Sequence, residues 1–516
     1  MDNVVAVVTC AVVVLAGSVG TLVAARRSAC GRVPDDLAGW ALAGRRHGGG
    51  LMWCLLGGTI YTAYTFTAVP GAVFSSGAIG FYAVPYTVLS CAIGFVLLPR
   101  LVSVARAHGY VTVADFVRGR YGSPLLALAV ALTGIFATMP YVALQLIGIR
   151  AVLTVLGLYS GGMAGDLVLA VVFAILALST YRYGLRAPVF AAVIKAVLVV
   201  ACTVVVAALA VAKLGTPPEI LERAGGAEVL ALSPALWPAF ASLALGSALA
   251  LFAFPHVLMV AFSARGPDVL RRTSGGLLGW AGMLAVFALL GVAALAAGVV
   301  LPPGQSELAV PVLMGVLAPS WLAGILFGVL VVAALVPAAV MSMGAAALFA
   351  RNVYVEFVNP TATDAQEARM ARLTSLVVKI GALAFALGLR DQAAINLHLL
   401  GAVWVLQTLP MIVLGLLRHT PRPFALLAGW LTGMVAGTVL VNEGGFTPLV
   451  VVHFGQFTAH VYTGIVALAV NIAVTAATQA LLRGLRVPRA PSGVIHPIHP
   501  PRVLREGVRR RDSGIS

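Results

Sequence analysis

The chain has 516 residues, of which 61% are hydrophobic and 10% are charged. Soluble domains contain about 25% charged residues, so this composition argues against a soluble enzyme and against a disordered or coiled-coil protein. A transmembrane helix takes about 20 apolar residues, and the chain has enough of them for about a dozen helices. The formal net charge is +16. In a membrane protein such an excess usually lies in cytoplasmic loops, so it does not indicate nucleic-acid binding.

Apolar runs separated by glycine, proline or charge predict thirteen membrane helices. Their expected spans are 3–25, 50–76, 78–100, 123–157, 166–183, 187–212, 236–263, 275–300, 320–350, 372–389, 392–417, 423–442 and 460–484. With the N-terminus outside, 27 of the 33 lysine and arginine residues fall in cytoplasmic loops or in the tail, and three fall in outer loops. This bias predicts a multi-pass plasma-membrane protein whose C-terminus is cytoplasmic.

Ionisable side chains are rare inside the predicted helices. None of the seventeen carboxylates falls in the middle of a helix, whereas five basic or histidine residues do: Arg150, Lys195, His256, Lys379 and His398. A charge inside the membrane is costly and marks a functional site by default. The resident charge is positive, which suits an anionic substrate. Arg150 and Lys379 lie about two turns from helix ends and can extend toward water, whereas Lys195 lies deeper.

The second and the seventh predicted helices contain breaks. These are Gly57-Gly58-Thr59 with Pro70-Gly71 in the second helix and Pro255-His256 in the seventh. The two helices start five helices apart, so two halves of five helices would each open with an interrupted helix. Secondary transporters often place their site at such helices, because freed carbonyls and helix ends bind ions and carboxylates.

Several stretches of the chain resemble the sodium:solute symporter family. They are ALAGRR (41–46), TFTAVPGAVFSSG (65–77), LLPRLVSVARAHGYVTVADFVRGRYGS (97–123), MPYVALQLIGI (139–149), PHVLMVAF (255–262) and ARNVYVEF (350–357). Two further runs, LVPAAVMSMGAAALFARNVY (335–354) and INLHLLGAVWVLQTLP (395–410), resemble the monocarboxylate permease branch of that family. Members of this branch take up acetate, pyruvate, lactate and propionate.

The resemblance extends over about residues 40–485 and implies a fold. The expected fold is an all-α integral membrane protein with two inverted five-helix repeats and broken first helices, which is a LeuT-like core. We accordingly expect an extra N-terminal helix and loop at 1–39, the inverted-repeat transport core at 40–420, two C-terminal helices at 421–486, and a disordered basic cytoplasmic tail at 487–516.

Two positions depart from the pattern of the sodium-coupled relatives. Those relatives place paired serine or threonine hydroxyls in the ninth helix, where this chain has Val336 and Pro337. They also often carry an aspartate in a Thr-Asp pair early in the sixth helix, where this chain has Ile194 and Lys195. Hard cations bind oxygen ligands. The loss of these oxygens leads us to expect that the Lys195 ammonium takes the place of the sodium ion.

In that case protons would drive transport, with Lys195 changing its charge as the cavity opens and closes. In the alternative, Lys195 is a fixed charge, and the transporter is either a uniporter or binds sodium elsewhere. The other residues expected at the cation-coupling site are Thr59, Ile60 and Ser342.

The substrate site is predicted between the two broken helices and the fourth and eleventh helices. Its candidate residues are Tyr61, Thr62, Tyr64, Gln145, His256, Trp404 and Gln407. Trp404 and Gln407 are three residues apart, which places them on one helix face. Amide and hydroxyl groups with one positive group suit a small carboxylate. Asn396 and His398 are explained more simply by packing or hydrogen bonds between helices.

The sequence therefore predicts a secondary active symporter for small monocarboxylates such as acetate, pyruvate, lactate and propionate, coupled to H⁺ or Na⁺, with the proton favoured. Its partners would be this anion and the lipid bilayer. We expect no enzymatic activity, catalytic residue, cofactor, bound metal, nucleic acid or required protein partner. The alternatives are a sodium-coupled symporter of proline or a sugar and, in other classes, a channel or a membrane-embedded transferase. The carboxylate-free helices argue against a transferase.

Overall fold

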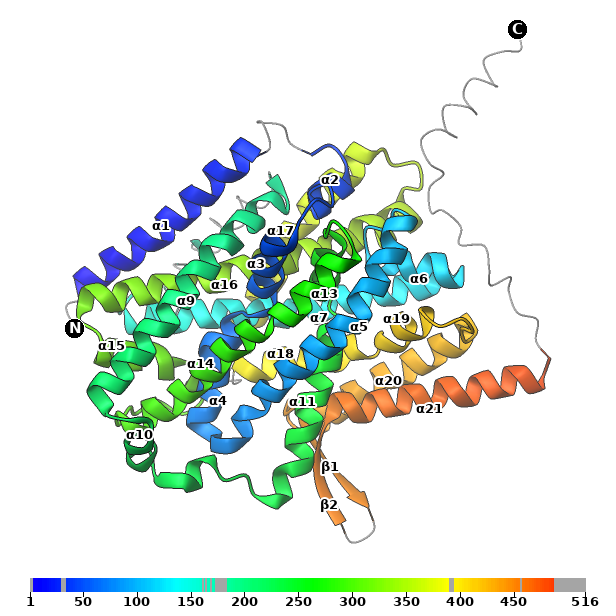
Figure 1. The fold of residues 1–516 in the computed structure, drawn as a ribbon. Coiled ribbons are helices and arrows are strands. Elements are labelled where there is room, and N and C mark those ends of the chain that lie inside the picture. Colours follow the sequence, from blue (N-terminus) through cyan, green and yellow to red (C-terminus); the bar gives the residue numbers. More distant parts are fainter. Residues whose placement is uncertain are drawn as a thin grey trace.

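The computed structural model describes residues 3–28, 34–159, 183–388, 394–454 and 457–486, with 162, 165–167 and 169–171. The expected tail at 487–516 lies outside these residues. Within them the chain forms a bundle of helices with one small hairpin (Figure 1). Ten of the described helices are long and apolar enough to cross a membrane, or eleven if one bent pair forms a single span.

The predicted count of thirteen membrane helices is not confirmed, for two reasons. Most of the predicted helix 166–183 lies outside the described residues. The second half of the broken second helix also runs on into the third, so that Tyr64–Ala107 forms one long helical stretch.

The first half of the chain contains the first interrupted helix. In order, its elements are α1 (Asn3–Ser28), α2 (Leu37–Leu42), α3 (Gly49–Ile60), the π-helix η1 (Tyr64–Ala68), α4 (Val69–Ser76), the 3-10 helix η2 (Gly77–Tyr82), α5 (Ala83–Ala107), α6 (Val113–Tyr121), α7 (Pro124–Val155), α9 (Arg186–Leu214) and α10 (Pro217–Arg223). The short helices α6 and α10 were not predicted from the sequence.

The second half contains the second interrupted helix. Its elements are η3 (Gly226–Leu230), η4 (Pro234–Leu236), α11 (Trp237–Leu251), α12 (Pro255–Phe262), α13 (Pro267–Gly276), α14 (Leu278–Ala296), η5 (Ser306–Leu308), α15 (Ala309–Leu317), α16 (Ser320–Phe349), the π-helix η6 (Ala350–Val358), α17 (Asp364–Gly388), α18 (Ala394–Leu406), α19 (Leu409–Gly415), α20 (Pro423–Glu443), β1 (Leu449–Phe454), β2 (Phe457–Tyr462) and α21 (Thr463–Gly484).

Both helices are interrupted as predicted, but the first break lies at 61–63, because Gly57-Gly58-Thr59 are still inside α3 and Pro70-Gly71 are inside α4. The helix α3 ends at Ile60, and Tyr61 has the extended dihedral angles φ −89° and ψ 106° before the chain re-enters a helix at η1. The helix α11 ends at Leu251, and α12 begins with Pro255. Proline suits the first position of a helix because it has no N–H and its φ is already helical.

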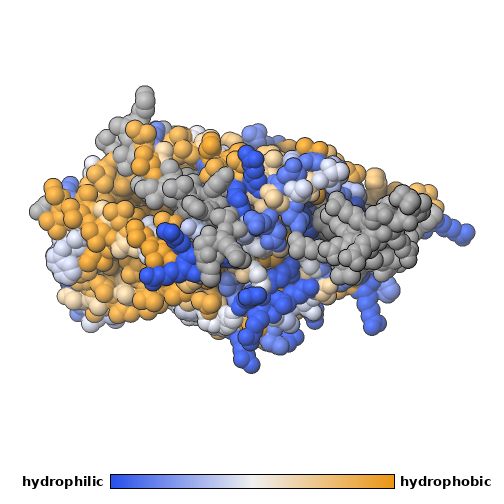
Figure 2. Space-filling model, turned by 90° about the horizontal axis from the view of Figure 1, so that it is seen from above, coloured by the Kyte–Doolittle hydropathy of each residue, from blue (hydrophilic) through white to orange (hydrophobic). Residues whose placement is uncertain are grey.

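The helix α16 is the most buried of the long helices, and α1 lies on the flank of the bundle (Figure 1). The most hydrophobic window of α16 is 94% buried, and that of α1 is 17% buried. Large apolar side chains of α1, including Val4, Val8, Val12 and Leu15, are more than half exposed. Seen from above, an apolar surface covers one part of the molecule and hydrophilic residues gather over another (Figure 2). Exposed apolar side chains on a flanking helix are suited to contact with lipid.

The structure also contains strands that the sequence did not predict. The strands β1 and β2 pair antiparallel between α20 and α21, from Leu449 opposite Tyr462 to Phe454 opposite Phe457. The predicted last helix, 460–484, therefore begins three residues too early, because α21 starts at Thr463. The run LVVVHF is rich in β-branched residues, which favour strands and could have indicated the hairpin.

Candidate functional site

Lys195 is a fully buried lysine in α9 that joins three helices. Its Nζ donates hydrogen bonds to the carbonyl oxygens of Gly58 at 2.8 Å, Tyr61 at 2.6 Å and Ala333 at 2.7 Å. The first two carbonyls flank the end of α3, and the third belongs to α16. A protonated lysine has three N–H donors, so these three acceptors match it.

The three carbonyls can accept from Lys195 because both helices are interrupted there. In a continuous helix each carbonyl accepts from the N–H four residues later. The end of α3 at Ile60 removes this partner for Gly58 and Tyr61. In α16 the residue four positions after Ala333 is Pro337, which has no N–H to donate. Pro337 belongs to the pair that stands where sodium-coupled relatives have hydroxyls, and it frees the third acceptor of the lysine.

The other residues predicted at the cation-coupling site make different contacts. The Thr59 hydroxyl donates to a carbonyl of its own helix at 2.6 Å. The Ser342 hydroxyl does the same at 2.8 Å and lies 3.4 Å from the hydroxyl of Ser375 on α17. Ile60 is buried at the end of α3. The hydrogen bonds of Lys195 are therefore made to the backbone and not to these side chains.

The two other basic residues expected inside helices also have partners. Lys379 on α17 donates to the Ser375 hydroxyl at 2.8 Å and to the Ser375 carbonyl at 3.2 Å. Arg150 at the end of α7 forms an ion pair with Glu307 of η5 at 3.1 Å, and both side chains are largely buried. Arg150 therefore contacts a carboxylate between α14 and α15.

A cluster of aromatic and histidine rings lies where both broken helices meet α7 and α18. The ring centroid of His398 lies 4.5 Å from that of Tyr141 and 4.7 Å from that of Tyr64. The ring of His256, at the start of α12, lies 5.6 Å from Tyr141 and 5.4 Å from Phe254. All five side chains are buried. The cluster occupies the place at which the sequence predicted the substrate site, and it includes Tyr64 and His256 from the predicted set.

The two histidines have unusual surroundings. Both are 0% exposed. Within the described part of the chain, neither ring nitrogen of His256 or of His398 has a hydrogen-bond partner. Leaving a buried polar group unpaired costs about 1–3 kcal/mol, so such groups are rare. The sequence favoured packing or hydrogen bonds between helices for His398. The structure shows the packing, against Tyr64, Tyr141 and Phe254, but no hydrogen bond of the His398 side chain.

Three of the predicted substrate residues shape the first break. The Gln145 side chain accepts from the Ala63 N–H at 3.0 Å, which fixes the chain just after the break. The Thr62 hydroxyl accepts from the Tyr64 N–H at 3.1 Å. The Tyr61 ring stacks on Trp280 of α14 with centroids 5.4 Å apart, so its contribution to the Lys195 site is its carbonyl.

Trp404 and Gln407 lie apart from this cluster. The Trp404 indole donates to Thr438 of α20 at 3.2 Å. The Gln407 side-chain oxygen accepts from Asn471 of α21 at 3.2 Å. The structure therefore does not bring these two predicted substrate residues to the broken helices. The two residues lie one turn apart as expected, and α18 and α19 meet at a 50° bend at this point.

Gly344 of α16 packs directly against His256. A methyl group at position 344 would lie 2.8 Å from both Cα and N of His256. We therefore expect Gly344→Ala to lower the stability of the protein by about 1–3 kcal/mol through overpacking, and to shift His256. Thermal unfolding of the purified protein in detergent measures the loss.

Gly282→Ala is the matched control for this substitution. Gly282 also lies within a long helix, α14, and has no atom within 4 Å of its added methyl group. An unchanged unfolding temperature for Gly344→Ala would contradict the close packing of α16 on α12.

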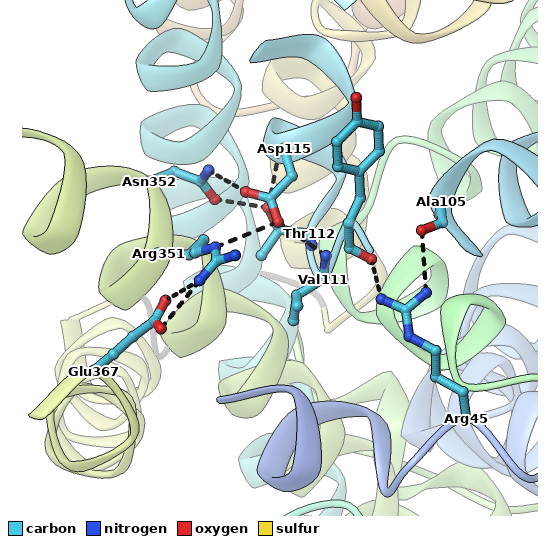
Figure 3. A network of polar contacts seen from close by, with 9 residues as sticks. Arg45, Ala105, Val111, Thr112, Asp115, Arg351, Asn352 and Glu367 are labelled. Carbon is cyan, nitrogen blue, oxygen red and sulfur yellow. Dashed lines mark hydrogen bonds and ion pairs between the residues drawn. The ribbon is translucent and has the colours of Figure 1, made fainter. Parts of the chain in front are cut away.

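At one end of the bundle, Asp115 organises the start of α6 (Figure 3). Its carboxylate accepts from the N–H groups of Val111 at 2.9 Å and Thr112 at 3.2 Å, while the Thr112 hydroxyl accepts from the Asp115 N–H at 3.0 Å. This reciprocal pattern is a capping box, which satisfies the free N–H groups at a helix start.

The same carboxylate ties α6 to two distant segments. Asn352 of η6 donates to Asp115 at 2.8 Å, and Arg351 lies 3.7 Å from it. Arg351 also donates to both oxygens of Glu367 in α17, at 3.0 and 3.1 Å. We call this end of the bundle, made by α6, η6 and the first turn of α17, the α6 end. The sequence did not single out these residues.

Near this end the chain also joins the two interrupted helices. The Arg265 N–H, after α12, donates to the carbonyl of His47, before α3, at 2.9 Å. Arg45 donates to the carbonyls of Ala105 and Tyr110 at 3.2 and 2.7 Å (Figure 3). The start of α3 is thus held against the end of α12 and the segment after α5.

Long apolar helices, two interrupted helices that meet inside the bundle, and a buried site at their breaks define a multi-pass membrane transporter of the secondary type. The sequence model of the Sodium:solute symporter family matches residues 40–437. The chain belongs to this family.

Individual relatives and solved structures agree with this assignment. The chain is 44% identical over 460 residues to a protein of Rhizobium johnstonii named monocarboxylate transport permease protein, an alignment that includes 87% of this chain and 92% of the relative. It is 31% identical over 440 residues to an uncharacterized symporter of Bacillus subtilis, YodF, with coverage of 84% and 85%. A Na⁺-coupled sialic acid symporter shares its fold with a TM-score of 0.75 at 15% identity, covering 92% of this chain and 98% of that protein.

Proposed function

We propose that the protein is a plasma-membrane symporter that takes up small monocarboxylates such as pyruvate, lactate, acetate or propionate together with a proton. The family membership and the name of the Rhizobium relative support transport of a monocarboxylate. The basic residues of the loops support an outer N-terminus and a cytoplasmic C-terminus. In this orientation the α6 end faces the cytoplasm.

The observation that carries the proton proposal is the position of the Lys195 ammonium. Its three acceptors are neutral backbone carbonyls at the end of α3 and in α16. A sodium ion in a protein is held by oxygen atoms of this kind. At this place the ammonium uses the oxygens that a metal ion would need, so the lysine and a sodium ion would exclude each other.

Lys195 can couple a proton to the movement of helices. With three acceptors around it, the protonated amine satisfies all its donors, whereas a neutral amine would set a lone pair against a carbonyl oxygen. A movement of α3 away from α16 separates Gly58 and Tyr61 from Ala333 and removes this match. Proton binding therefore favours the closed arrangement of the two helices, and proton release favours the open one.

The substrate site in this proposal is the ring cluster beside the breaks. Tyr64 and His256 contribute side chains, while Thr62 and Gln145 hold the first break in shape. His256 lies in the first turn of α12, where backbone N–H groups lack helical acceptors and favour an anion.

The test is uptake of labelled pyruvate into proteoliposomes, with pH and sodium gradients imposed separately. We expect accumulation when the outside is more acidic than the inside, in sodium-free buffer, above the level of protein-free liposomes. Accumulation that needs a sodium gradient would contradict the proton proposal and keep the monocarboxylate proposal. No uptake of pyruvate, lactate, acetate or propionate under either gradient would contradict both.

A further inference from the structure

His256 and His398 are two buried histidines that the coupling site does not use. Both are fully buried, and all four of their ring nitrogens lack a hydrogen-bond partner in the described structure. Their rings both contact Phe254, with centroids 5.4 and 6.0 Å away, and both contact Tyr141. Two unpaired histidines that share the same neighbours point to a ligand that binds between them.

The number and kind of these atoms indicate which ligand would satisfy them. A neutral imidazole has one N–H donor and one acceptor nitrogen. The pair therefore offers two donors, which suit the two oxygens of a carboxylate, and two acceptors, to which a hydroxyl of the ligand can donate. The hydroxyl of the neighbouring Tyr64 is already bonded to Tyr82 at 3.0 Å.

The surrounding side chains and backbone add to this pattern. His256 is the second residue of α12, so the free N–H groups of that helix start lie beside its ring. Gly344 of α16 packs against the backbone of His256 and leaves no room there even for a methyl group. Aromatic rings of Tyr64, Tyr141 and Phe254 surround the pair, which favours a short carbon chain.

We propose that His256 and His398 together bind the polar atoms of the substrate, and that the preferred substrate is a short 2-hydroxy monocarboxylate. The two N–H donors hold the carboxylate next to the start of α12, and an acceptor nitrogen accepts a hydrogen bond from the 2-hydroxyl group. This inference rests on the proposed monocarboxylate transport and adds to it the residues that select the acid.

The experiment compares lactate with propionate, which has the same carbon chain without the hydroxyl. Initial rates of uptake into proteoliposomes give KM for both acids in the wild-type protein, His256→Phe, His398→Phe and His398→Gln. The control is His460→Phe, an exposed histidine of β2. Binding to the purified proteins is measured in parallel as the shift in unfolding temperature at saturating lactate or propionate.

For the wild-type protein and the control we expect KM for lactate to be about 3–10-fold lower than for propionate, which corresponds to one hydrogen bond. Each phenylalanine variant is expected to raise KM for lactate by about tenfold or more and to abolish the difference between the acids. His398→Gln keeps a donor and an acceptor and is expected to restore part of the preference for lactate.

The possible failures are distinct. If the wild-type protein transports both acids and the phenylalanine variants keep its KM values and its preference, the histidine pair is not the binding site, and the proposed function stands. If lactate and propionate have equal KM in the wild-type protein, the 2-hydroxy preference is wrong. If the wild-type protein accumulates pyruvate but neither transports nor binds lactate or propionate, this inference fails and the proposed function stands. If it takes up none of pyruvate, lactate, acetate and propionate under either gradient, both fail. If a phenylalanine variant does not fold, the KM values of His398→Gln for lactate and propionate are compared with those of the wild-type protein instead.

Discussion

Lys195→Met is expected to lower the accumulation of pyruvate driven by a pH gradient at least about tenfold, which brings it to the level of protein-free liposomes. Methionine has a similar length but no charge and no donor, so the carbonyls of Gly58, Tyr61 and Ala333 lose their partner. Hydrogen bonds to charged groups contribute about 1.5–3 kcal/mol each, so the loss of three exceeds the 1.4 kcal/mol that corresponds to a factor of ten.

Loss of coupling and loss of folding are separated by a second readout. Exchange of labelled against unlabelled pyruvate at equal concentrations needs alternating access but no driving force. We expect Lys195→Met to retain this exchange. Lys213→Met is the control, because Lys213 lies on the same helix, α9, but its side chain is exposed. The control is expected to accumulate pyruvate as the wild-type protein does.

Pro337→Ala tests the same site without removing the lysine. Alanine restores an N–H four residues after Ala333, and this N–H competes with Lys195 for the Ala333 carbonyl. We expect Pro337→Ala to accumulate less pyruvate under a pH gradient than the wild-type protein and to exchange labelled for unlabelled pyruvate at an unchanged rate. Full pH-driven accumulation in Lys195→Met would contradict the coupling role of Lys195, whatever the result with Pro337→Ala.

The outline of this site could be predicted because its determinants are local. Glycine and proline near the breaks indicate which two helices are interrupted, Pro255 at the break itself and Gly57-Gly58 a few residues before it, and a lysine deep in an apolar run has few explanations. The hydrogen-bond acceptors of Lys195 could not be predicted in the same way. They are backbone carbonyls, and which carbonyl is free depends on where α3 ends and on the position of Pro337 relative to Ala333.

The differences between the structure and the predicted substrate site have a different origin. Trp404 and Gln407 lie one turn apart as expected, but their side chains contact α20 and α21 and not the broken helices. His398 was set aside because packing or a hydrogen bond between helices is the usual fate of a polar residue in a membrane bundle. Its missing hydrogen-bond partner is a property of the packed rings of Tyr64 and Tyr141, and no pattern in the sequence reports it.

The network at the α6 end was missed because its members are far apart in the chain. Asp115 and Asn352 are 237 residues apart. Each looks like an ordinary polar residue at a helix end, and their resemblance to family segments gave no reason to pair them. A buried carboxylate that accepts from two N–H groups and an amide is recognised once the segments are packed together.

Asp115→Ala is expected to lower the free energy of unfolding by about 3–5 kcal/mol. The carboxylate is 0% exposed, and its loss leaves the N–H groups of Val111 and Thr112 and the amide of Asn352 without this acceptor. Each buried unpaired group costs about 1–3 kcal/mol. Arg351 keeps its hydrogen bonds to Glu367, which limits the loss on that side.

Unfolding by sodium dodecyl sulfate in mixed micelles measures this change. Asp268→Ala is the control, because Asp268 also lies in the first turn of a helix next to an arginine but its side chain is 78% exposed. Exposed ion pairs contribute at most about 1 kcal/mol, so the control is expected to stay close to the wild-type protein. Asp115→Asn separates charge from hydrogen bonding, since an amide oxygen can still accept from the helix start. If Asp115→Ala were as stable as the control, Asp115 would not hold α6, η6 and α17 together.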